Sequence, residues 1–295
     1  MTQVWAVTSK KGGVGKTTTA GILAQGLAQK LLNGTGQPAG SVVILDLDPQ
    51  GNQADYFGVR QHVWHPTRNP GGKCVSDLLL GRVRDLREIL VKLDRLEDGL
   101  SRPNLYLIPA SRRLEDELED LFLQDFNNAR RAARGDGNGY VPMNQLLAHL
   151  LEPLEGVASY IIIDTPPQLP ILKSAVYHYA DSIVVPTKAE DMSVIGCIQH
   201  TDDLATHIKG GAKARLRYIL PTMIDGRVAS HKQILSDLVN AYTMERMAAP
   251  IPSAVAVSQS SGEGGRTLLE YARPDHPARR AYQHLIDRVY KENIR

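Results

Sequence analysis

The chain has 295 residues, of which 42% are hydrophobic and 22% are charged, and its formal net charge is +2. These values are ordinary for a globular protein, so they exclude a chain that is disordered throughout. The small net charge does not decide whether the protein binds a polyanion, since that depends on local patches.

Two classes of protein are disfavoured by simple patterns. Cys74 and Cys197 lie far apart without a CxxC pattern, which predicts neither a disulfide framework nor a zinc or iron–sulfur site. No segment reaches the roughly 18 apolar residues of a membrane span, and the first residues lack the features of a signal peptide. We therefore expect a cytoplasmic protein.

Short β-rich runs alternate with helical patterns along the chain. The expected strands are Val4–Ser9, Val42–Asp48, Asn104–Pro109, Tyr160–Asp164, Ser182–Thr187, Leu216–Thr222 and Met247–Pro252. The expected helices are Thr17–Leu32, Leu114–Ala133, Asn144–Leu151, Pro170–Tyr179, Ser193–Ile208, Ser230–Tyr242 and Pro277–Glu292. This alternation predicts a doubly wound α/β domain over residues 1–295, with a mainly parallel sheet and helices on both faces.

Two stretches depart from that pattern. Val59–Lys73 is rich in His, Pro and Gly, and Asn127–Tyr140 contains several glycines, so both are predicted to be surface loops without chemistry. The strand expected from Val4 leaves no room before it for an N-terminal helix-turn-helix domain.

A glycine-rich run lies between the first expected strand and the first expected helix. Its residues are Gly12, Gly13, Val14, Gly15, Lys16, Thr17 and Thr18. Glycines let backbone N–H groups surround a phosphate, and the helix directs its positive end at the anion. Lys16 can reach the β- and γ-phosphate oxygens and the Thr17 hydroxyl can bind Mg²⁺, so the run predicts an ATP-binding phosphate loop.

Carboxylates follow two other expected strands. Asp46 and Asp48 end an apolar strand with a spacing that turns both side chains to one face, and Asp164 follows three isoleucines. Ligands of doubly wound sheets bind at the carboxyl ends of the strands, so these aspartates are expected beside the phosphate loop. An acid at the end of a buried strand, such as Asp164, is suited to bind Mg²⁺ through water.

The loop differs from the standard GxxxxGK[ST] pattern because Lys11 stands where the first glycine would be. This resembles the deviant Walker A motif of the ParA/MinD superfamily of P-loop ATPases, in its ParA-type, Soj-like branch. The segments 46–52, 104–111, 163–167 and 221–223 occur in the order of that family. The resemblance implies a Mg²⁺-dependent ATPase in which Lys11 reaches the nucleotide of a second subunit.

The resemblance also assigns roles to single residues. Lys11, Lys16 and Asp48 would be catalytic, with Asp48 orienting the attacking water and Asp46 supporting the site. Thr17, Asp48 and Asp164 would hold the metal ion. The adenine would lie against Pro221, Thr222 and Met223 and near Pro252, although a purely structural role for these four residues is an equal alternative.

The C-terminal helix and the basic residues indicate whether the protein binds a membrane or DNA. The helix Pro277–Glu292 carries a modest apolar stripe with mixed charges opposite, which favours packing on the body over membrane insertion. That favours DNA, and Arg227 matches a DNA-binding position of ParA relatives. Further candidate basic residues are Lys209, Lys213, Arg279 and Arg280. The chain lacks two basic features of relatives, since 204–206 is neutral and 253–259 is not Arg-rich.

Three functions remain open. The first is a ParA-type ATPase for plasmid or chromosome partitioning, in which ATP-bound homodimers bind non-specific nucleoid DNA and a ParB-like centromere-binding protein stimulates hydrolysis. The second is a ParA-like ATPase that positions a protein cargo. The third is a MinD/FlhG-like regulator on a membrane, which the C-terminal helix disfavours.

Overall fold

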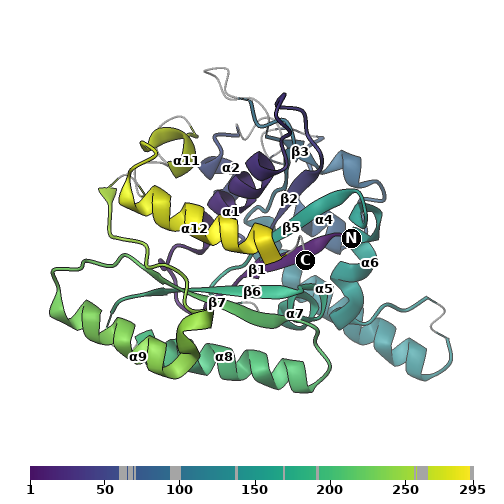
Figure 1. Cartoon of the computed structure of the whole chain (residues 1–295). Coiled ribbons are helices and arrows are strands. Elements are labelled where there is room, and N and C mark those ends of the chain that lie inside the picture. The colour runs from purple at the N-terminus through teal and green to yellow at the C-terminus, as the bar shows by residue number, and fades with distance from the viewer. Residues whose placement is uncertain are drawn as a thin grey trace.

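The computed structural model describes residues 1–59, 65, 69, 71–93, 101–136, 139–168, 170–190, 193–255, 257 and 265–292. Its centre is one seven-stranded sheet with the strand order β3-β4-β2-β5-β1-β6-β7 (Figure 1). The strands are β1 (Gln3–Val7), β2 (Ser41–Asp46), β3 (Val91–Lys92), β4 (Leu105–Ile108), β5 (Ala158–Asp164), β6 (Ser182–Lys188) and β7 (Arg215–Thr222). All neighbours are parallel except β3 and β4, which pair antiparallel at one edge.

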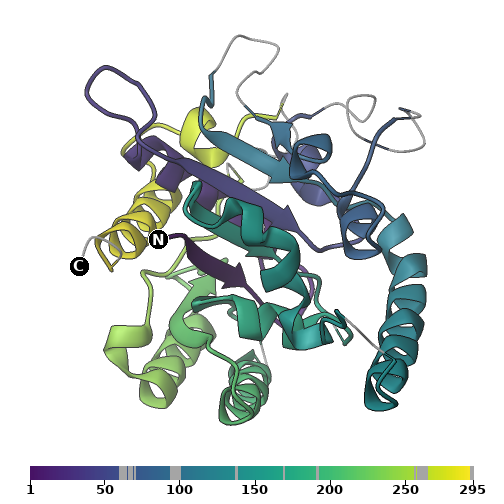
Figure 2. The same ribbon diagram turned by 90° about the vertical axis from the view of Figure 1, so that its right-hand side faces the viewer.

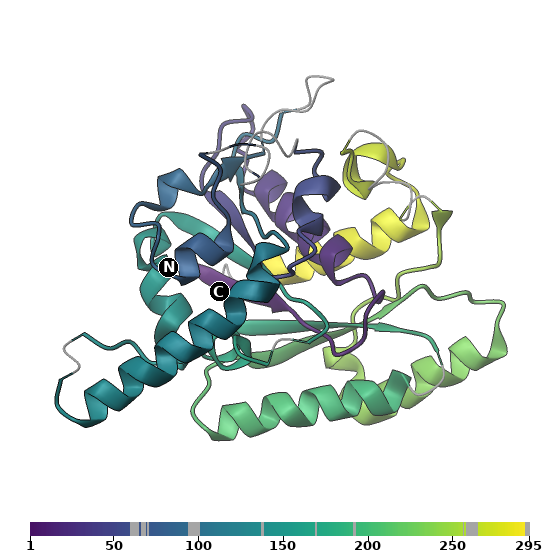
Figure 3. The same ribbon diagram turned by 180° about the vertical axis from the view of Figure 1, so that it is seen from behind.

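Helices cover both faces of this sheet, as predicted for a doubly wound fold. One face carries α1 (Lys16–Lys30), α2 (Asn52–Tyr56), α11 (Leu268–Tyr271) and α12 (Pro277–Glu292). The other face carries α4 (Val75–Leu79), α5 (Arg113–Ala133), α6 (Leu146–Leu151), α7 (Lys173–Tyr179), α8 (Ser193–Lys209) and α9 (Ala229–Arg246). Figures 1 and 3 show α12 and the paired helices α8 and α9 on opposite sides of the sheet.

The central strands supply both hydrophobic cores because successive side chains point to opposite faces. In β1, Val4 and Ala6 belong to the core under α4–α9, whereas Trp5 and Val7 belong to the core under α1 and α12. The buried strands therefore need apolar residues at every position, which explains why their sequences do not alternate.

The C-terminal helix α12 packs along α1, so the prediction that its apolar stripe faces the body is confirmed. Ile286 is buried against Gly26, where an added Cβ would lie 2.2 Å from the Ile286 Cδ1 atom. The hydroxyl groups of Thr19 and Tyr282 lie 3.2 Å apart, and Lys30 pairs with Asp287 at 2.7 Å. In the described ranges, no helix is both long enough and apolar enough to span a membrane.

Several expected boundaries were wrong. Met247–Pro252 is not a strand but makes two isolated bridges, Ile219 with Met247 and Ile224 with Pro252. Prolines at 250 and 252 lack the N–H groups that a continuous ladder needs. The short β3, α2, α4 and α11 were not predicted, because elements of two to five residues are too short to show a period.

The two expected loops have different outcomes. Most of Val59–Lys73 lies outside the described residues. The expected helix Leu114–Ala133 is confirmed, because α5 ends at the same residue and runs away from the sheet (Figure 2). The loop expected over Asn127–Tyr140 overlapped this helix and begins only after Ala133. Alanine and arginine are strong helix formers, and the helix ends just before Gly135, which adopts the left-handed backbone that terminates many helices.

A buried ion pair attaches α11 to the rest of the fold. The Arg102 guanidinium donates to both carboxylate oxygens of Glu270, at 2.8 and 2.7 Å, and to the backbone carbonyls of Phe57 and Gly265. Only 3% of the Arg102 side chain and 10% of the Glu270 side chain are exposed. The pair therefore joins α11 to the segment that precedes β4 and to the residue that follows α2.

We predict that Glu270→Ala destabilises the protein by about 3–5 kcal/mol, because it leaves the Arg102 charge buried without its partner. The free energy of unfolding measured in urea provides the test. The matched control is Asp85→Ala, which removes the partner of Arg87 in an ion pair whose arginine side chain is 89% exposed. That control should cost clearly less stability than Glu270→Ala, and equal losses in the two variants would contradict the prediction.

Candidate active site

The glycine-rich loop connects β1 to α1 at the carboxyl edge of the sheet. Gly13 and Gly15 adopt left-handed backbone conformations, with φ of 67° and 88°. A Cβ added at either position would meet no atom within 4 Å, so backbone conformation and not crowding calls for glycine there. Left-handed residues in such a loop gather consecutive N–H groups into an anion-binding concavity.

The two lysines of the loop lie in different surroundings. Lys16 is only 6% exposed, and its ammonium group donates to the backbone carbonyl of Lys11 at 2.9 Å. Burial lowers the pKa of Lys16, while the nearby carboxylates of Asp164 and Asp48 act in the opposite direction. The Lys11 ammonium donates to the Ser193 hydroxyl at 3.2 Å, so in a single chain it lies against the start of α8.

Three carboxyl groups meet beside this loop. Asp46 and Asp164 occupy paired positions at the ends of β2 and β5, and both are fully buried. Asp48 follows β2 and is 8% exposed. Asp46 accepts hydrogen bonds from the backbone N–H of Asp48 at 2.9 Å and of Gln53 at 3.3 Å, so it fixes the turn that carries Asp48. The structure thus brings the predicted aspartates together, with Asp46 in a supporting position.

Gln53 on α2 belongs to this cluster although the sequence analysis did not single it out. Its fully buried amide donates to the backbone carbonyl of Thr17 and to the Asp164 carboxylate, both at 2.9 Å. The only sequence signal for it was its place shortly after Asp46 and Asp48. Gln53 ties the first turn of α1 to the acid at the end of β5.

Burial raises the pKa values of Asp46 and Asp164. Desolvation raises the pKa of Asp164 to about 7, against hydrogen bonds from Gln53 and Thr17 that lower it. The pKa of Asp46 lies well above its ordinary value, first because of burial and then because of the neighbouring Asp164. Close carboxyl groups in a buried site disfavour each other's charge.

The residues fit a magnesium ion. Asp164 Oδ1 is a buried oxygen atom with no hydrogen-bond partner among the described residues, and the Thr17 hydroxyl lies beside the same carboxylate. Mg²⁺ prefers oxygen ligands and usually needs only one or two carboxylates, because water and phosphate oxygens complete its shell. Consistent with this, the described part of the chain contains no group of three or more His, Cys, Asp or Glu side chains arranged to hold a metal.

The predicted adenine-side residues lie next to one another and to the loop. The Thr222 hydroxyl donates to the backbone carbonyl of Val14 at 2.9 Å, and the Ile251 N–H donates to the Pro221 carbonyl at 2.8 Å. Met223 has a φ of 56°, which is uncommon for a residue other than glycine. Pro252 forms a bridge with Ile224 beside this turn. At least Thr222 therefore also supports the loop.

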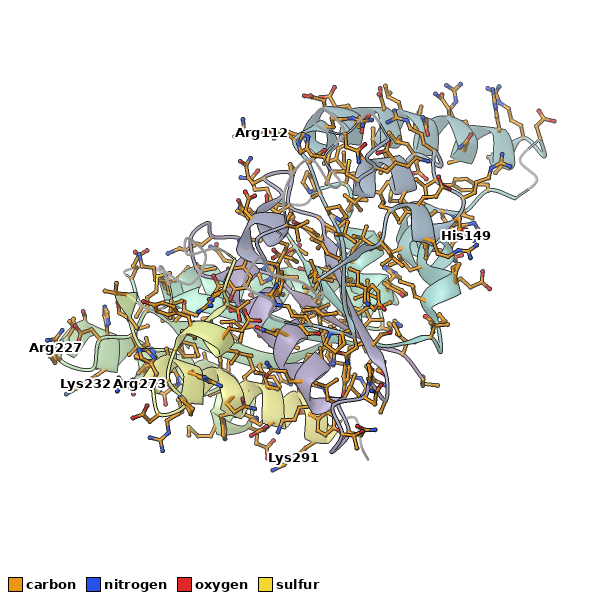
Figure 4. All side chains as sticks on the ribbon, turned by 90° about the horizontal axis from the view of Figure 1, so that it is seen from above. Arg112, His149, Arg227, Lys232, Arg273 and Lys291 are labelled. Atoms are coloured by element: carbon orange, nitrogen blue, oxygen red, sulfur yellow. The ribbon has the colours of Figure 1, made fainter. Side chains whose placement is uncertain are left out.

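The five candidate DNA-binding residues are divided between the end of the sheet where its parallel strands begin and the carboxyl edge, where those strands finish. Lys209 and Lys213 lie near the amino ends of β6 and β7, where Lys213 pairs with Asp181 at 3.1 Å. Arg227 follows the carboxyl end of β7, pairs with Asp225 at 2.8 Å and lies at one end of the molecule in Figure 4.

Arg279 and Arg280 begin α12, whose first turns lie beside the first turn of α1. They therefore share the carboxyl edge with Arg227, away from Lys209 and Lys213. In a single chain, Lys209 and Lys213 therefore lie at the end of the sheet opposite to Arg279 and Arg280.

We predict that Asp164→Asn stabilises the nucleotide-free protein at neutral pH. The folded-state pKa of about 7 lies above the ordinary value, so the folded state binds more protons and wild-type stability falls as pH rises from about 4 to 7. The free energy of unfolding of the variant should exceed that of wild type by an amount that grows by on the order of a few kcal/mol over this window. Urea unfolding at several pH values provides the measurement.

Asp203→Asn is the matched control, because the ion pair with Lys173 lowers the pKa of Asp203 despite partial burial. Its removal should cost stability at neutral pH and little at low pH. Parallel pH profiles of wild type and Asp164→Asn would contradict the prediction.

Comparisons with known proteins agree with this geometry. The chain is 28% identical over 271 residues to the chromosome partitioning protein ParA of Myxococcus xanthus, a match that covers 90% of this chain and 81% of that protein. Among solved structures, apo McdA from Cyanothece superposes with a TM-score of 0.74 at 21% identity and full coverage of both chains.

A second structure carries ligands. Cobyrinic acid a,c-diamide synthase from Mycobacterium smegmatis, solved with bound ADP and magnesium, has a TM-score of 0.71 at 24% identity and covers 99% of this chain and 95% of that one. These structural likenesses show the fold. The family model described as AAA domain matches residues 2–216. With its phosphate loop and paired strand-end aspartates, the chain belongs to this family and is a ParA/MinD-type ATPase.

Proposed function

We propose that this protein is a ParA-type partition ATPase, which binds non-specific DNA as an ATP-bound homodimer and leaves it after hydrolysis stimulated by a ParB-like protein. The observation that carries the proposal is Lys11. It is a cation at the first position of the phosphate loop, and its described contact with another element is with one serine hydroxyl of α8. The name of the M. xanthus relative supports the partition role.

Each residue of the site has a defined task in this proposal. The loop N–H groups and Lys16 would bind the β- and γ-phosphates, and Thr17 and Asp164 would hold a magnesium ion, with Gln53 orienting Asp164. Magnesium, when bound, supplies positive charge that neutralises the phosphates. Asp48 orients and deprotonates the attacking water. The nearly complete burial of Asp48 and Lys16 limits competing solvent.

Lys11 couples hydrolysis to dimer formation in this proposal. To reach the phosphates of a second copy, its side chain must leave the Ser193 hydroxyl, and a cation delivered in this way stabilises charge that develops during phosphoryl transfer. Hydrolysis is then fast only in the closed dimer.

The DNA surface is proposed at the carboxyl edge of the sheet, where Arg227, Arg279 and Arg280 lie. Two copies that meet across their nucleotides would bury the phosphate loops in the contact and would bring these arginines of both subunits to its rim, where together they neutralise DNA phosphates. The protein would then be nucleoid-associated. The membrane alternative finds no support in α12, because its apolar residues are buried against α1.

We predict that Asp48→Ala binds ATP, dimerises and hydrolyses ATP at least about 100-fold more slowly, because it loses the group that orients water. Single-turnover hydrolysis and light scattering with ATP provide the measurement. Lys16→Ala is the contrasting control, since it should lose nucleotide binding and therefore remain a monomer. Normal hydrolysis by Asp48→Ala would remove Asp48 from the mechanism.

We also predict that DNA pelleting requires ATP and fails with ADP or without nucleotide. Arg227→Glu should weaken DNA binding about tenfold and reduce its salt dependence, with ATP binding unchanged. Lys209→Glu, the same charge reversal at the opposite edge, should have a smaller effect. Equal binding in all nucleotide states, or binding to anionic liposomes in place of DNA, would overturn the partition assignment. Binding of neither would favour a protein cargo.

A further inference from the structure

Helix α5 extends away from the body of the molecule. Figures 3 and 4 show its C-terminal half beyond the sheet and the other helices. Its base is fixed, because Leu114 and Leu121 are buried and Glu117 accepts from Arg82 and Arg113 at 2.5 and 2.9 Å. The outer half thus presents a defined helical face to solvent.

That outer face carries large apolar side chains. Phe122, Leu123 and Phe126 are 53%, 54% and 52% exposed. At helical spacing Leu123 lies opposite the buried Leu114 and Leu121, Phe126 lies beside Leu123, and Phe122 lies on the flank of the same stripe. Three such side chains on one solvent-facing stripe are the kind of surface that marks an interaction site.

The charges on the same stripe are arranged symmetrically about the apolar centre. Glu119 stands four residues before Leu123, and Arg130 stands four residues after Phe126. Glu115 and Arg134 repeat this relation at eight residues on each side. All four are exposed, and in the described part of the chain none of them forms an ion pair. In the single chain the Arg130 guanidinium lies over the Phe126 ring, 5.7 Å from its centroid.

Such a stripe is complementary to itself in the antiparallel direction. When two α5 helices cross about a two-fold axis midway between Leu123 and Phe126, Leu123 of each faces Phe126 of the other. The same register places Glu119 opposite Arg130. An unrelated partner would need only an apolar face, whereas this spacing of acids and bases matches a second copy of the same helix.

A hollow beside the stripe suits this arrangement. It has a volume of about 370 Å³ and is lined by Glu119, Phe122, Leu123 and Ile171. Leu123 faces the Phe126 ring of the second copy in this register, so that ring can enter the hollow. Ile171 follows closely after Asp164 in sequence, so the contact would lie near the segment that leaves the active site.

We propose that α5 forms a symmetric, antiparallel contact with α5 of a second copy of this chain. The contact is separate from the nucleotide-dependent dimer and needs no nucleotide. It would link ATP-bound dimers to one another. It goes beyond the proposed function, which stands whether or not this contact forms.

Sedimentation velocity without nucleotide, over a wide range of protein concentration, tests the proposal. We expect a reversible, concentration-dependent dimer in wild type and in Lys16→Ala. Glu119→Arg and Arg130→Glu should each weaken association about tenfold, because two symmetry-related attractions become repulsions. The double variant carrying both changes should regain association, since every pair is again opposite in charge.

Phe126→Ser provides a second test, because it should abolish the contact between the two α5 helices while circular dichroism shows an intact fold. Arg87→Glu is a control charge reversal at an exposed position away from α5 and should change nothing. The proposal is overturned if wild type stays monomeric without nucleotide at every concentration, or if the double variant associates no better than the single ones. If the α5 contact does not form while ATP-dependent dimers form normally, the proposed role in DNA partitioning still stands.

Discussion

The active site depends on two buried carboxyl groups placed side by side where parallel strands end. Asp46 and Asp164 are register partners on β2 and β5, and neither is exposed to water. Such a pair is costly unless hydrogen bonds and a cation compensate it. The hydrogen bonds come from Gln53, from Thr17 and from the backbone of the turn after β2. The positive charge of Lys16 lies close enough to attract the Asp164 carboxylate.

The same constraint explains the surrounding architecture. Strands covered on both faces keep water from the acids, and this requires apolar residues at each strand position and helices on both sides. The first turn of α1 provides both the phosphate loop's last residues and the Thr17 carbonyl that Gln53 binds. The Gln53 amide therefore joins the loop proposed to bind phosphate to the acid proposed to bind magnesium.

Much of this was predictable because it depends on local patterns. The phosphate loop follows from the order of strand, glycines, Lys16 and Thr17, and the aspartates follow from their places after apolar strands. Gln53 was not predictable, since its role depends on a five-residue helix whose sequence has no clear period. The distribution of the basic residues was not predictable either, because the end of the sheet that a residue occupies depends on the direction of the strand or helix that carries it. The end of α5 at Ala133 was predicted correctly, because helix-forming residues continue up to the glycines that follow it.

The packing of α12 on α1 connects the phosphate loop to a distant part of the sequence. Thr19, Gly26 and Lys30 of α1 contact Tyr282, Ile286 and Asp287 of α12. This contact covers one side of the helix whose first turn carries Lys16 and Thr17. A substitution that loosens α12 can therefore disturb nucleotide binding although it changes no residue near the nucleotide.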